Sequence, residues 1–531
     1  MNENSPINSL LQPARRRFLQ AAGILTLGVA AGLSANGLFL PISAQAQENK
    51  PPKGGHLVIA MHSASSSDHL DPASYTMAYM YTVGFQLFNT LLELGPDGKL
   101  TGALVESWEP ANKDASSWIF RLKKGITFHN GKELTAKDVI YSLNHHRGDN
   151  TKSGGKGVLL AVEDITSSDP YEFTVTLKNG NVDFPAAFVD VHMGIGPDGE
   201  DFDKGIGTGA FILEDFQPGV RALTKRNPNY WHPDRAHVDS VETIAMDDTT
   251  ARMAALMSGQ AHIINAVEPR MADRLNARPD IELLRTAENS MYAFPMRTDS
   301  ELLRNNDLRL ALKYAIDREE LQKSLLVGTG AIGNDIPIPS WNPLHSKDVP
   351  QRAYDADRAA FHLKKSGFEG AIPLSVSDNG FTGSADAAQL YQASAAKAGI
   401  NIEVERVPSD GYWEEVWMKK PFVASNWAVR PTADFMLSML LQSNAPWNET
   451  GWSNEKFDKL LAESRVELDE TRRKQLYHDM QVIIADEGGE LIPVFTDNIS
   501  AASSNVKGYV SVPGGGDMSG YRLAEKVWLE A

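Results

Sequence analysis

Arg430 is the side chain whose chemistry points most directly to a bound molecule. It ends the segment Asn426-Trp427-Ala428-Val429-Arg430. A guanidinium keeps its charge inside a cleft and can bind a carboxylate through two hydrogen bonds. The indole of Trp427 can form an apolar wall or stack on a flat group. The segment therefore predicts a site for a carboxylate or another anion, with Asn426, Trp427 and Arg430 as contacts, unless Arg430 instead forms a structural ion pair with an acidic side chain.

A second set of polar side chains follows an apolar run near the start of the mature chain. Leu57-Val58-Ile59-Ala60 is typical of a short buried strand, and the loop His62-Ser63-Ala64-Ser65 comes after it. Short hydroxyl groups and free backbone N–H groups suit a polar ligand. We expect at least one of His62, Ser63 and Ser65 to contact the ligand; the alternative is a solvated loop.

Several other kinds of chemistry find no support in the sequence. There is no cysteine, so disulfides, thiolate metal sites and thiol nucleophiles are excluded. The segment 194–199 fits G-x-G-x-x-G by letters, but Pro197 and the acidic residues that follow do not open a helix suited to pyrophosphate. No H-E-x-x-H zinc motif, phosphate loop or nucleophile elbow is present. We therefore expect no catalytic residue, no resident metal and no cofactor.

The N-terminal segment has the pattern of an export signal. Arg15, Arg16 and Arg17 precede Phe18-Leu19, an apolar stretch without acids runs over 21–40, and Ala44-Gln45-Ala46 ends it. This pattern is typical of a cleaved twin-arginine signal peptide over 1–46. The alternative is a membrane anchor, which the many glycines of the stretch disfavour. We expect a soluble periplasmic protein cleaved near Ala46.

The composition restricts the class of protein. The chain has 531 residues, enough for two or three packed domains, and 42% of them are hydrophobic. A net charge of −17 disfavours nucleic-acid binding, because a phosphate backbone would be repelled. An acidic protein that binds an anion needs a local positive group, and Arg430 is the candidate for that group.

Strand and helix patterns alternate along the chain, which predicts a mixed α/β fold of open sheets covered by helices. We predict strands at 57–60, 118–122, 171–177, 374–376, 402–404 and 491–495, and helices at 77–93, 308–326, 354–365, 387–398, 454–467 and 470–486. Thr135 with Asp138 predicts a capping box at a further helix start. Asp378 follows the strand predicted at 374–376.

An ordered series of segments resembles one known family. The series contains Leu104-Val105-Glu106-Ser107-Trp108, the run Phe120-Arg121-Leu122-Lys123-Lys124-Gly125-Ile126-Thr127-Phe128-His129-Asn130-Gly131, Arg226-Asn227-Pro228-Asn229-Tyr230-Trp231, and Arg309-Leu310-Ala311-Leu312-Lys313-Tyr314-Ala315-Ile316-Asp317-Arg318. It covers roughly 55–520. The chain resembles solute-binding protein family 5, the extracytoplasmic receptors of dipeptide, oligopeptide, nickel and opine importers.

The resemblance implies a two-lobed periplasmic-binding-protein fold of class II type. Lobe I would hold 55–295 and 491–531 with an extra subdomain at about 88–190, and lobe II would hold 296–490. The segments 290–296 and 491–495 would be hinges, so that a ligand between the lobes closes them. The partners implied are the permease and ATPase subunits of an ABC importer. We expect a monomer that is not an enzyme.

The resemblance also bears on the ligand. Peptide receptors of this family carry an Asp where Val429 stands here, with Arg430 next to it, and this departure favours a carboxylate-bearing solute such as an opine, an amino-acid derivative or a short peptide. It implies contacts from the loop of His62 and from Tyr292 on the hinge strand. Asp378, which follows a predicted strand of lobe II, is a further candidate contact. A nickel complex, with His62 and His69 as candidates, a sugar, or hydrolysis of a substrate in the same fold are the alternatives.

Overall fold

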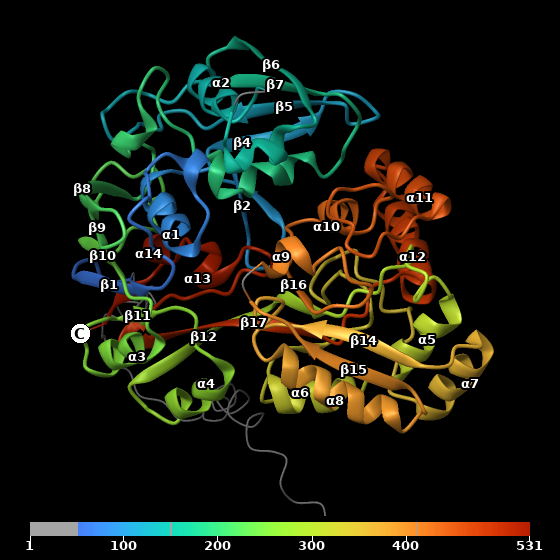
Figure 1. The fold of residues 1–531 in the computed structure, drawn as a ribbon. Helices are drawn as coiled ribbons and strands as arrows, with labels where there is room; N and C mark the ends of the chain where they lie inside the picture. The colour runs from blue at the N-terminus through green and yellow to red at the C-terminus, as the bar shows by residue number, and fades with distance from the viewer. Residues whose placement is uncertain (1–50, 149–150, 410, 531) are drawn as a thin grey trace, which may run out of the picture. The chain divides into compact units, whose positions relative to one another are not determined.

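Two long antiparallel strands lie at the centre of the fold and connect its two lobes. The computed structural model describes residues 51–148, 151–409 and 411–530, so the predicted signal peptide lies outside the described residues. Strand β12 (Ile281–Ala293) pairs with β17 (Val494–Ser503) from Ile281–Ser503 to Tyr292–Val494. Figure 1 shows both strands crossing between two groups of elements. The predicted hinge segments, 290–296 and 491–495, overlap the ends of these two strands where Tyr292 pairs with Val494; their action as hinges stays a prediction.

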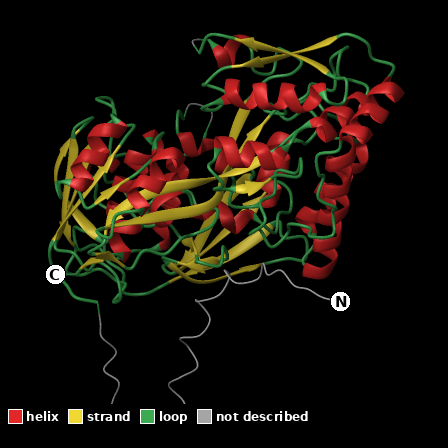
Figure 2. Cartoon of the chain, turned by 90° about the horizontal axis from the view of Figure 1, so that it is seen from below, coloured by secondary structure: helices red, strands yellow, loops and turns green. Residues whose placement is uncertain are grey.

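The paired strands belong to one large mixed sheet. Its order is β16-β12-β17-β11-β1-β10-β9-β8, with β13 added on β17. Figure 2 shows its strands in yellow with helices in red on either side. The sheet crosses from lobe I, on the side of β1, to lobe II, on the side of β16. The remaining strands are β1 (His56–Met61), β8 (Phe211–Gln217), β9 (Arg221–Arg226), β10 (Ser240–Ala245), β11 (Ile263–Ile264), β13 (Ala331–Ile332) and β16 (Ser425–Ala428).

The pairing of β12 with β17 is interrupted at one point, which divides the part of β12 in lobe I from the part that meets lobe II. The register shifts between Thr286 and Ser290, and Glu288 inside this bulge has φ +49°. Beyond the bulge, Ser290–Ala293 pairs with β16. The backbone N–H of Glu288 donates to Asp497 on β17 at 3.1 Å. A bulge with a left-handed residue is a natural place for the strand to bend.

Lobe I packs its helices around the strand β1. Leu57, Ile59, Tyr79, Phe211 and Val241 are fully buried in its main core. The lobe contains α1 (Ala78–Leu87), α3 (Thr249–Met257), α4 (Pro269–Asn276), α13 (Asp517–Gly520) and α14 (Leu523–Lys526), the short 3-10 helices η1 (Pro72–Ser74) and η5 (Phe202–Lys204), and the strand pair β18 (Val506–Lys507) and β19 (Trp528–Leu529).

The predicted extra subdomain has its own sheet and core. Four antiparallel strands in the order β4-β5-β7-β6 bury Phe120, Phe173 and Phe188, and Figure 1 draws them at the top. Its elements are β2 (Leu92–Leu94), β3 (Leu100–Gly102), β4 (Val105–Pro110), β5 (Ser117–Leu122), β6 (Val162–Asp169), β7 (Glu172–Leu177), α2 (Ala136–His145), η2 (Gly154–Leu159), η3 (Phe184–Val189) and η4 (Val191–Met193).

Lobe II is built mostly from helices around two buried clusters. One contains Phe294, Leu312 and Tyr391, and the other contains Trp427, Leu437 and Tyr477. The parallel strands β14 (Ala371–Val376) and β15 (Asn401–Arg406) complete it. Its helices are α5 (Asn306–Ala315), α6 (Arg318–Leu325), α7 (Ala356–Ser366), α8 (Ser384–Ala396), α9 (Tyr412–Glu415), α10 (Ala433–Leu440), α11 (Glu455–Val466) and α12 (Glu470–Glu487).

Direct contacts also join the subdomain to lobe II. Asp183 forms an ion pair with Arg473 on α12, and Asn181 donates to the Asp434 carboxylate at 3.3 Å. The backbone N–H of Val182 donates to the carbonyl of Arg465 at 2.8 Å. Contacts group Pro51–Ala531 as one unit, so the exact boundaries of the lobes stay a prediction.

Most elements match the sequence patterns, and two differ for local reasons. The helix predicted over 77–93 ends at Leu87, and Leu92–Leu94 forms β2 instead. The helix predicted over 308–326 is two helices, because Asp317 caps the start of α6 by accepting from the Glu320 N–H. The capping box at Thr135 and Asp138 is present. None of the helices within the described ranges has the length and apolar character needed to cross a membrane.

Asp335 gives a test of the packing next to the hinge. It is fully buried, pairs with Arg318 at 2.7 Å and Arg352 at 3.3 Å, and accepts from the Ile492 N–H just before β17. Asp335→Ala leaves two buried cations without their carboxylate. We expect the free energy of unfolding to fall by about 3–5 kcal/mol, measured by urea denaturation.

The matched control is Asp280→Ala, which removes the carboxylate of an exposed pair with Arg278. It is expected to leave the urea midpoint unchanged, because exposed pairs contribute little. Equal effects of the two substitutions would contradict the role given to Asp335.

Candidate functional site

Two adjoining cavities lie between the lobes. The first, called here the arginine cavity, has a volume of about 280 Å³ and is lined by Tyr81, Asp190, His192, Arg430 and Arg522 among others. The second, called the hinge cavity, has a volume of about 490 Å³ and is lined by His62 and Tyr292 among others. Tyr521 lines both cavities. The two together form the candidate binding cleft.

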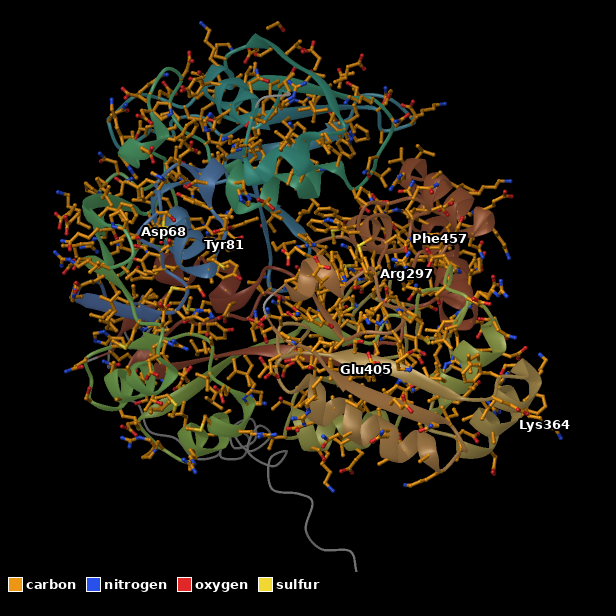
Figure 3. The ribbon with its side chains drawn as sticks, in the orientation of Figure 1. Asp68, Tyr81, Arg297, Lys364, Glu405 and Phe457 are labelled. Atoms are coloured by element: carbon orange, nitrogen blue, oxygen red, sulfur yellow. The ribbon has the colours of Figure 1, made fainter. Side chains whose placement is uncertain are left out.

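Each wall of the arginine cavity comes from a different part of the chain. Tyr81, labelled in Figure 3, and Phe85 come from α1 of lobe I. Asp190 and His192 come from the subdomain at η4. Residues 428–431, which end and follow β16, supply the lobe II side. The cavity therefore exists only where lobe I, the subdomain and lobe II meet.

The Tyr521 side chain reaches the cleft from a left-handed turn. Met518, Ser519 and Tyr521 have φ of 46°, 60° and 60°, a conformation that costs roughly 1–2 kcal/mol for each residue with a Cβ. The buried Asp517 holds the turn, because its carboxylate accepts from the Met518 N–H at 2.7 Å and from the Ser500 hydroxyl at 3.0 Å. Strain of this kind persists only where the surroundings impose it, and such sites are often ligand sites.

Arg430 enters the arginine cavity without a carboxylate partner among the described residues. Its guanidinium lies 5.7 Å from the Phe435 ring centroid, and Nη2 is 3.9 Å from Sδ of Met439. Its Nε is buried and makes no hydrogen bond in the described structure. Burial lowers the pKa of Arg430, and the charge of Asp190 opposes this. The guanidinium is thus held by apolar groups, and an anion in the cavity would be its natural partner.

Asp190 is already occupied by a histidine. Its Oδ1 lies 2.6 Å from Nδ1 of His192, and Nε2 of the same ring lies 2.8 Å from the Tyr75 carbonyl oxygen. Although burial alone would lower it, the pKa of His192 is raised by the hydrogen bond to Asp190 and by its charge. The carboxylate of Asp190, whose charge acts on Arg430, is therefore already paired with His192.

A buried ion network forms the floor next to Arg430. Arg235 binds Glu93 at 2.5 Å and Glu525 at 2.7 Å. Arg522 is 5% exposed and lies 3.9 Å from the Phe85 ring centroid. Although burial favours its neutral form, the hydrogen bond from Arg235 and the charge of Arg522 lower the pKa of Glu93 to about 2. Arg235 is thus paired with both carboxylates, whereas Arg522 lies 4.0 Å from each of them and its Nη1 makes no hydrogen bond in the described structure. Arg430 and Arg522 are therefore both cations that line the cavity.

The hinge cavity contains two residues predicted from the sequence. His62 follows β1, and its backbone N–H donates to the Asn265 amide oxygen at 3.1 Å; burial lowers the pKa of its ring. Tyr292, on β12, stacks on Phe381 with centroids 4.2 Å apart, and burial raises the pKa of its phenol. Both side chains reach the cleft wall.

The other predicted contacts lie apart from the walls of the two cavities. The Ser63 N–H donates to Asp247 at 2.8 Å, and the Ser65 N–H donates to Asp68 at 2.7 Å. The Asp378 carboxylate accepts from the Gly383 N–H at 3.1 Å. Asn426 is exposed and donates to the carbonyl of Gly380. The Ser63 and Ser65 bonds are made by the backbone, whereas the Asp378 and Asn426 side chains bind backbone groups of lobe II. Their roles as ligand contacts stay a prediction.

Trp427 is part of the core of lobe II. It is 7% exposed, and its indole N–H donates to Glu449 at 2.7 Å. Trp417 donates to the same carboxylate, and the Trp417 and Trp427 rings lie 6.2 Å apart. The indole is therefore one layer behind the cavity wall, where it supports the segment that carries Arg430.

Sequence reasoning missed the residues that complete the arginine cavity. Asp190, His192, Tyr81 and Tyr521 are far apart in the chain and have no motif of their own. Gly514-Gly515-Gly516 also lines this cavity. The only signal was the cluster of three glycines, which fits a close approach of backbone to another group.

Among the described residues, no group of three or more His, Asp or Glu side chains is arranged to hold a metal ion. His62 binds Asn265, and His69 lies 4.0 Å from Asp203. The two histidines considered for nickel thus have separate partners.

Comparisons with known proteins agree with this architecture. A family model described as bacterial extracellular solute-binding proteins, family 5, matches residues 99–448, more than half of the chain. The chain is 24% identical to the dipeptide-binding protein of Escherichia coli K12 over 550 aligned positions, covering 94% of this chain and 98% of the relative.

Solved structures share the fold at lower identity. HbpA2 from Haemophilus parasuis superposes with a TM-score of 0.80 at 21% identity, over 90% of this chain and all of that one. AgaA in complex with agropinic acid, from A. tumefacien R10, gives a TM-score of 0.73 at 20% identity, over 90% of this chain and 99% of that one. These likenesses establish the two-lobed fold.

The buried carboxylate of Glu449, which accepts from the Trp427 indole, should make the stability of the protein depend on pH. Burial raises the pKa of Glu449 to about 7 in the folded protein, above the value of about 4.3 expected when it is unfolded. Its contribution to stability is therefore fully present below about pH 4 and is lost as the pH rises through 7. We expect Glu449→Gln, which keeps an acceptor for the indoles, to reduce the fall in unfolding temperature between pH 5 and pH 8.

Thermal unfolding followed by tryptophan fluorescence measures this effect. Glu405→Gln is the control, because Glu405 (labelled in Figure 3) is an exposed carboxylate on β15 that accepts from Ser375. An unchanged pH dependence in Glu449→Gln would show that Glu449 is not the buried acid that titrates.

Proposed function

Because the chain belongs to the bacterial extracellular solute-binding proteins of family 5, we propose that it is the periplasmic receptor of an ABC importer for a small carboxylate-bearing solute. In this proposal the protein captures the solute in the cleft between the lobes and delivers it to the permease, while the ATPase subunits supply the energy. It acts as a soluble monomer after removal of a signal peptide near Ala46. It binds its ligand without changing it.

The proposal that the ligand bears a carboxylate rests on one observation. Arg430 is a largely buried cation at the meeting point of the lobes, and no carboxylate among the described residues pairs with it. Burying a charge is costly unless a partner or hydrogen bonds compensate for it. A ligand carboxylate placed against the outer edge of the guanidinium supplies that partner.

The size of the cleft limits the solute. The volumes of the two cavities, about 280 and 490 Å³, fall within or near the range of ordinary small-molecule sites. A short peptide or an opine-like amino-acid derivative could place its carboxylate in the arginine cavity and extend past Tyr521 into the hinge cavity. His62 and Tyr292 would then contact its other end.

The contacts between the subdomain and lobe II support closure around the ligand. Asp183 with Arg473 and Asn181 with Asp434 join the subdomain directly to lobe II. A ligand that binds both lobes stabilises this closed arrangement through its differential affinity for it. The bulge at Glu288 gives the crossing strand a place to bend.

A thermal-shift panel tests the ligand class. We would unfold and refold the protein to remove bound ligand and then add dipeptides, longer peptides, opines, sugars, and nickel with chelators. At a ligand concentration one hundred times Kd, the stabilisation should be about 2.7 kcal/mol. We expect carboxylate-bearing compounds to raise the unfolding temperature of the wild type and Arg430→Ala to abolish this shift.

The matched control is Arg278→Ala, which removes an exposed arginine outside the cleft. It should respond to ligands as the wild type does. Shifts produced only by neutral sugars or nickel complexes would refute the carboxylate class, and would favour a receptor of the same fold for those solutes. Recovery of a chemically altered ligand after incubation would instead identify a hydrolase.

A further inference from the structure

The two hydrogen bonds of His192 require its imidazole to be protonated. Nδ1 lies 2.6 Å from a carboxylate oxygen of Asp190, and Nε2 lies 2.8 Å from the carbonyl oxygen of Tyr75. Both neighbours are acceptors, whereas a neutral imidazole has a single N–H to donate. Only the imidazolium satisfies both contacts. The geometry therefore places a proton-dependent positive charge in the wall of the arginine cavity.

The charge of His192 decides how Asp190 acts on Arg430. While His192 is charged, its pairing with Asp190 is neutral overall, and Arg430 has no compensating anion. If the imidazole loses a proton, its remaining N–H can still bind Asp190, but the negative charge of Asp190 is no longer balanced in the cavity that contains Arg430. The trio then has no net charge, and a ligand anion must compete with Asp190.

Other ionisable groups surround His192 but already have partners or lie further away. On α2 and η1, His145 binds Asp71 at 2.8 Å, and His146 accepts or donates at 2.6 Å to Ser153 while burial lowers its pKa to about 4. The Tyr81 ring on α1 lies 6.2 Å away and contacts Tyr521. The remaining groups on packed elements are Lys156 on η2, Asp183 at the start of η3, and Glu93 and Arg522 in the cavity floor.

We propose that the Asp190–His192 pair makes anion binding at Arg430 depend on a proton: the cavity binds a carboxylate while His192 is protonated and releases it as His192 deprotonates. This inference rests on the proposed function, because it takes Arg430 as the carboxylate anchor. Binding of the anion and binding of the proton then favour each other by the same factor. The affinity for a carboxylate falls by up to about tenfold for each pH unit above the pKa of His192.

Acetate, the smallest carboxylate, is the probe for this coupling. Histidine and arginine side chains would be labelled for NMR, with the His192 signal assigned through His192→Gln and the Arg430 signal through Arg430→Lys. The His192 pKa and the apparent Kd of acetate would be measured from pH 5 to pH 9 at constant ionic strength. Acetamide, which has the same shape without the charge, is the ligand control. We expect acetate, and not acetamide, to raise the pKa of His192.

Two substitutions change the coupling in opposite directions. Asp190→Asn removes the competing anion, so acetate should keep its affinity at high pH. His192→Gln leaves Asp190 permanently unpaired by a cation, so acetate should bind weakly and to the same extent from pH 6 to pH 9. His145→Gln is the matched control, since His145 also pairs with a carboxylate but does not line the arginine cavity; its pH dependence should equal that of the wild type. If His192→Gln does not fold, the wild type and Asp190→Asn still decide the result.

The outcomes separate this inference from the proposed function. Acetate that shifts the Arg430 signal with the same Kd at pH 6 and pH 9, and leaves the His192 pKa unchanged, overturns the coupling and leaves the anchor in place. Acetate that shifts neither signal removes the anchor as well, and both proposals fail together. A raised His192 pKa with the two opposite variant effects supports the coupling.

Discussion

The pairing of β12 with β17 is the constraint on which the rest of the structure depends. These two strands connect the lobes and therefore set how the facing surfaces of the lobes meet. Their hydrogen bonds run from Ile281 to Tyr292 and hold the end of β12 against β16. Since Arg430 follows β16 by two residues, the same ladder places the guanidinium opposite α1 and η4. A shift of one residue in this register would turn the segment before Arg430 over and remove it from the cavity.

Sequence patterns were sufficient for the elements and the family but not for the whole site. Apolar alternation predicted strands such as β5 and β7, because a half-buried strand must alternate. Arg430 could be selected from the chemistry of its guanidinium, His62 because it follows an apolar run, and Tyr292 because the resemblance places it on a hinge strand. Asp190 and His192 could not, since their meaning comes from hydrogen bonds to Tyr75 and from the opposite lobe. The ends of the helices at Leu87 and Ala315 also depended on tertiary contacts and on the cap at Asp317.

The acids that line the arginine cavity are held by other groups, which leaves Arg430 without a carboxylate partner among the described residues. In a chain with a net charge of −17, acids are plentiful, yet the two of this cavity, Glu93 and Asp190, both have partners of their own. Asp190 holds His192, Glu93 holds Arg235, and Asp517 holds the turn of Tyr521. Pairing each acid with a fixed donor keeps it from neutralising Arg430. This arrangement would favour anionic ligands, because an internal carboxylate that competed for Arg430 would lower the affinity for every one of them.

Two features of the cleft reduce the stability of the empty protein. The left-handed turn at Met518–Tyr521 stores backbone strain, and Arg430 keeps a buried Nε without a hydrogen-bond acceptor in the described structure. Both costs are expected where binding requires a shape and a charge that the fold alone would not select. In the proposed function, a ligand anion would offset the second cost only in the closed arrangement, since the cavity needs α1, η4 and the segment after β16 together. The guanidinium would then give the ligand a higher affinity for the closed state, and that difference in affinity would drive closure.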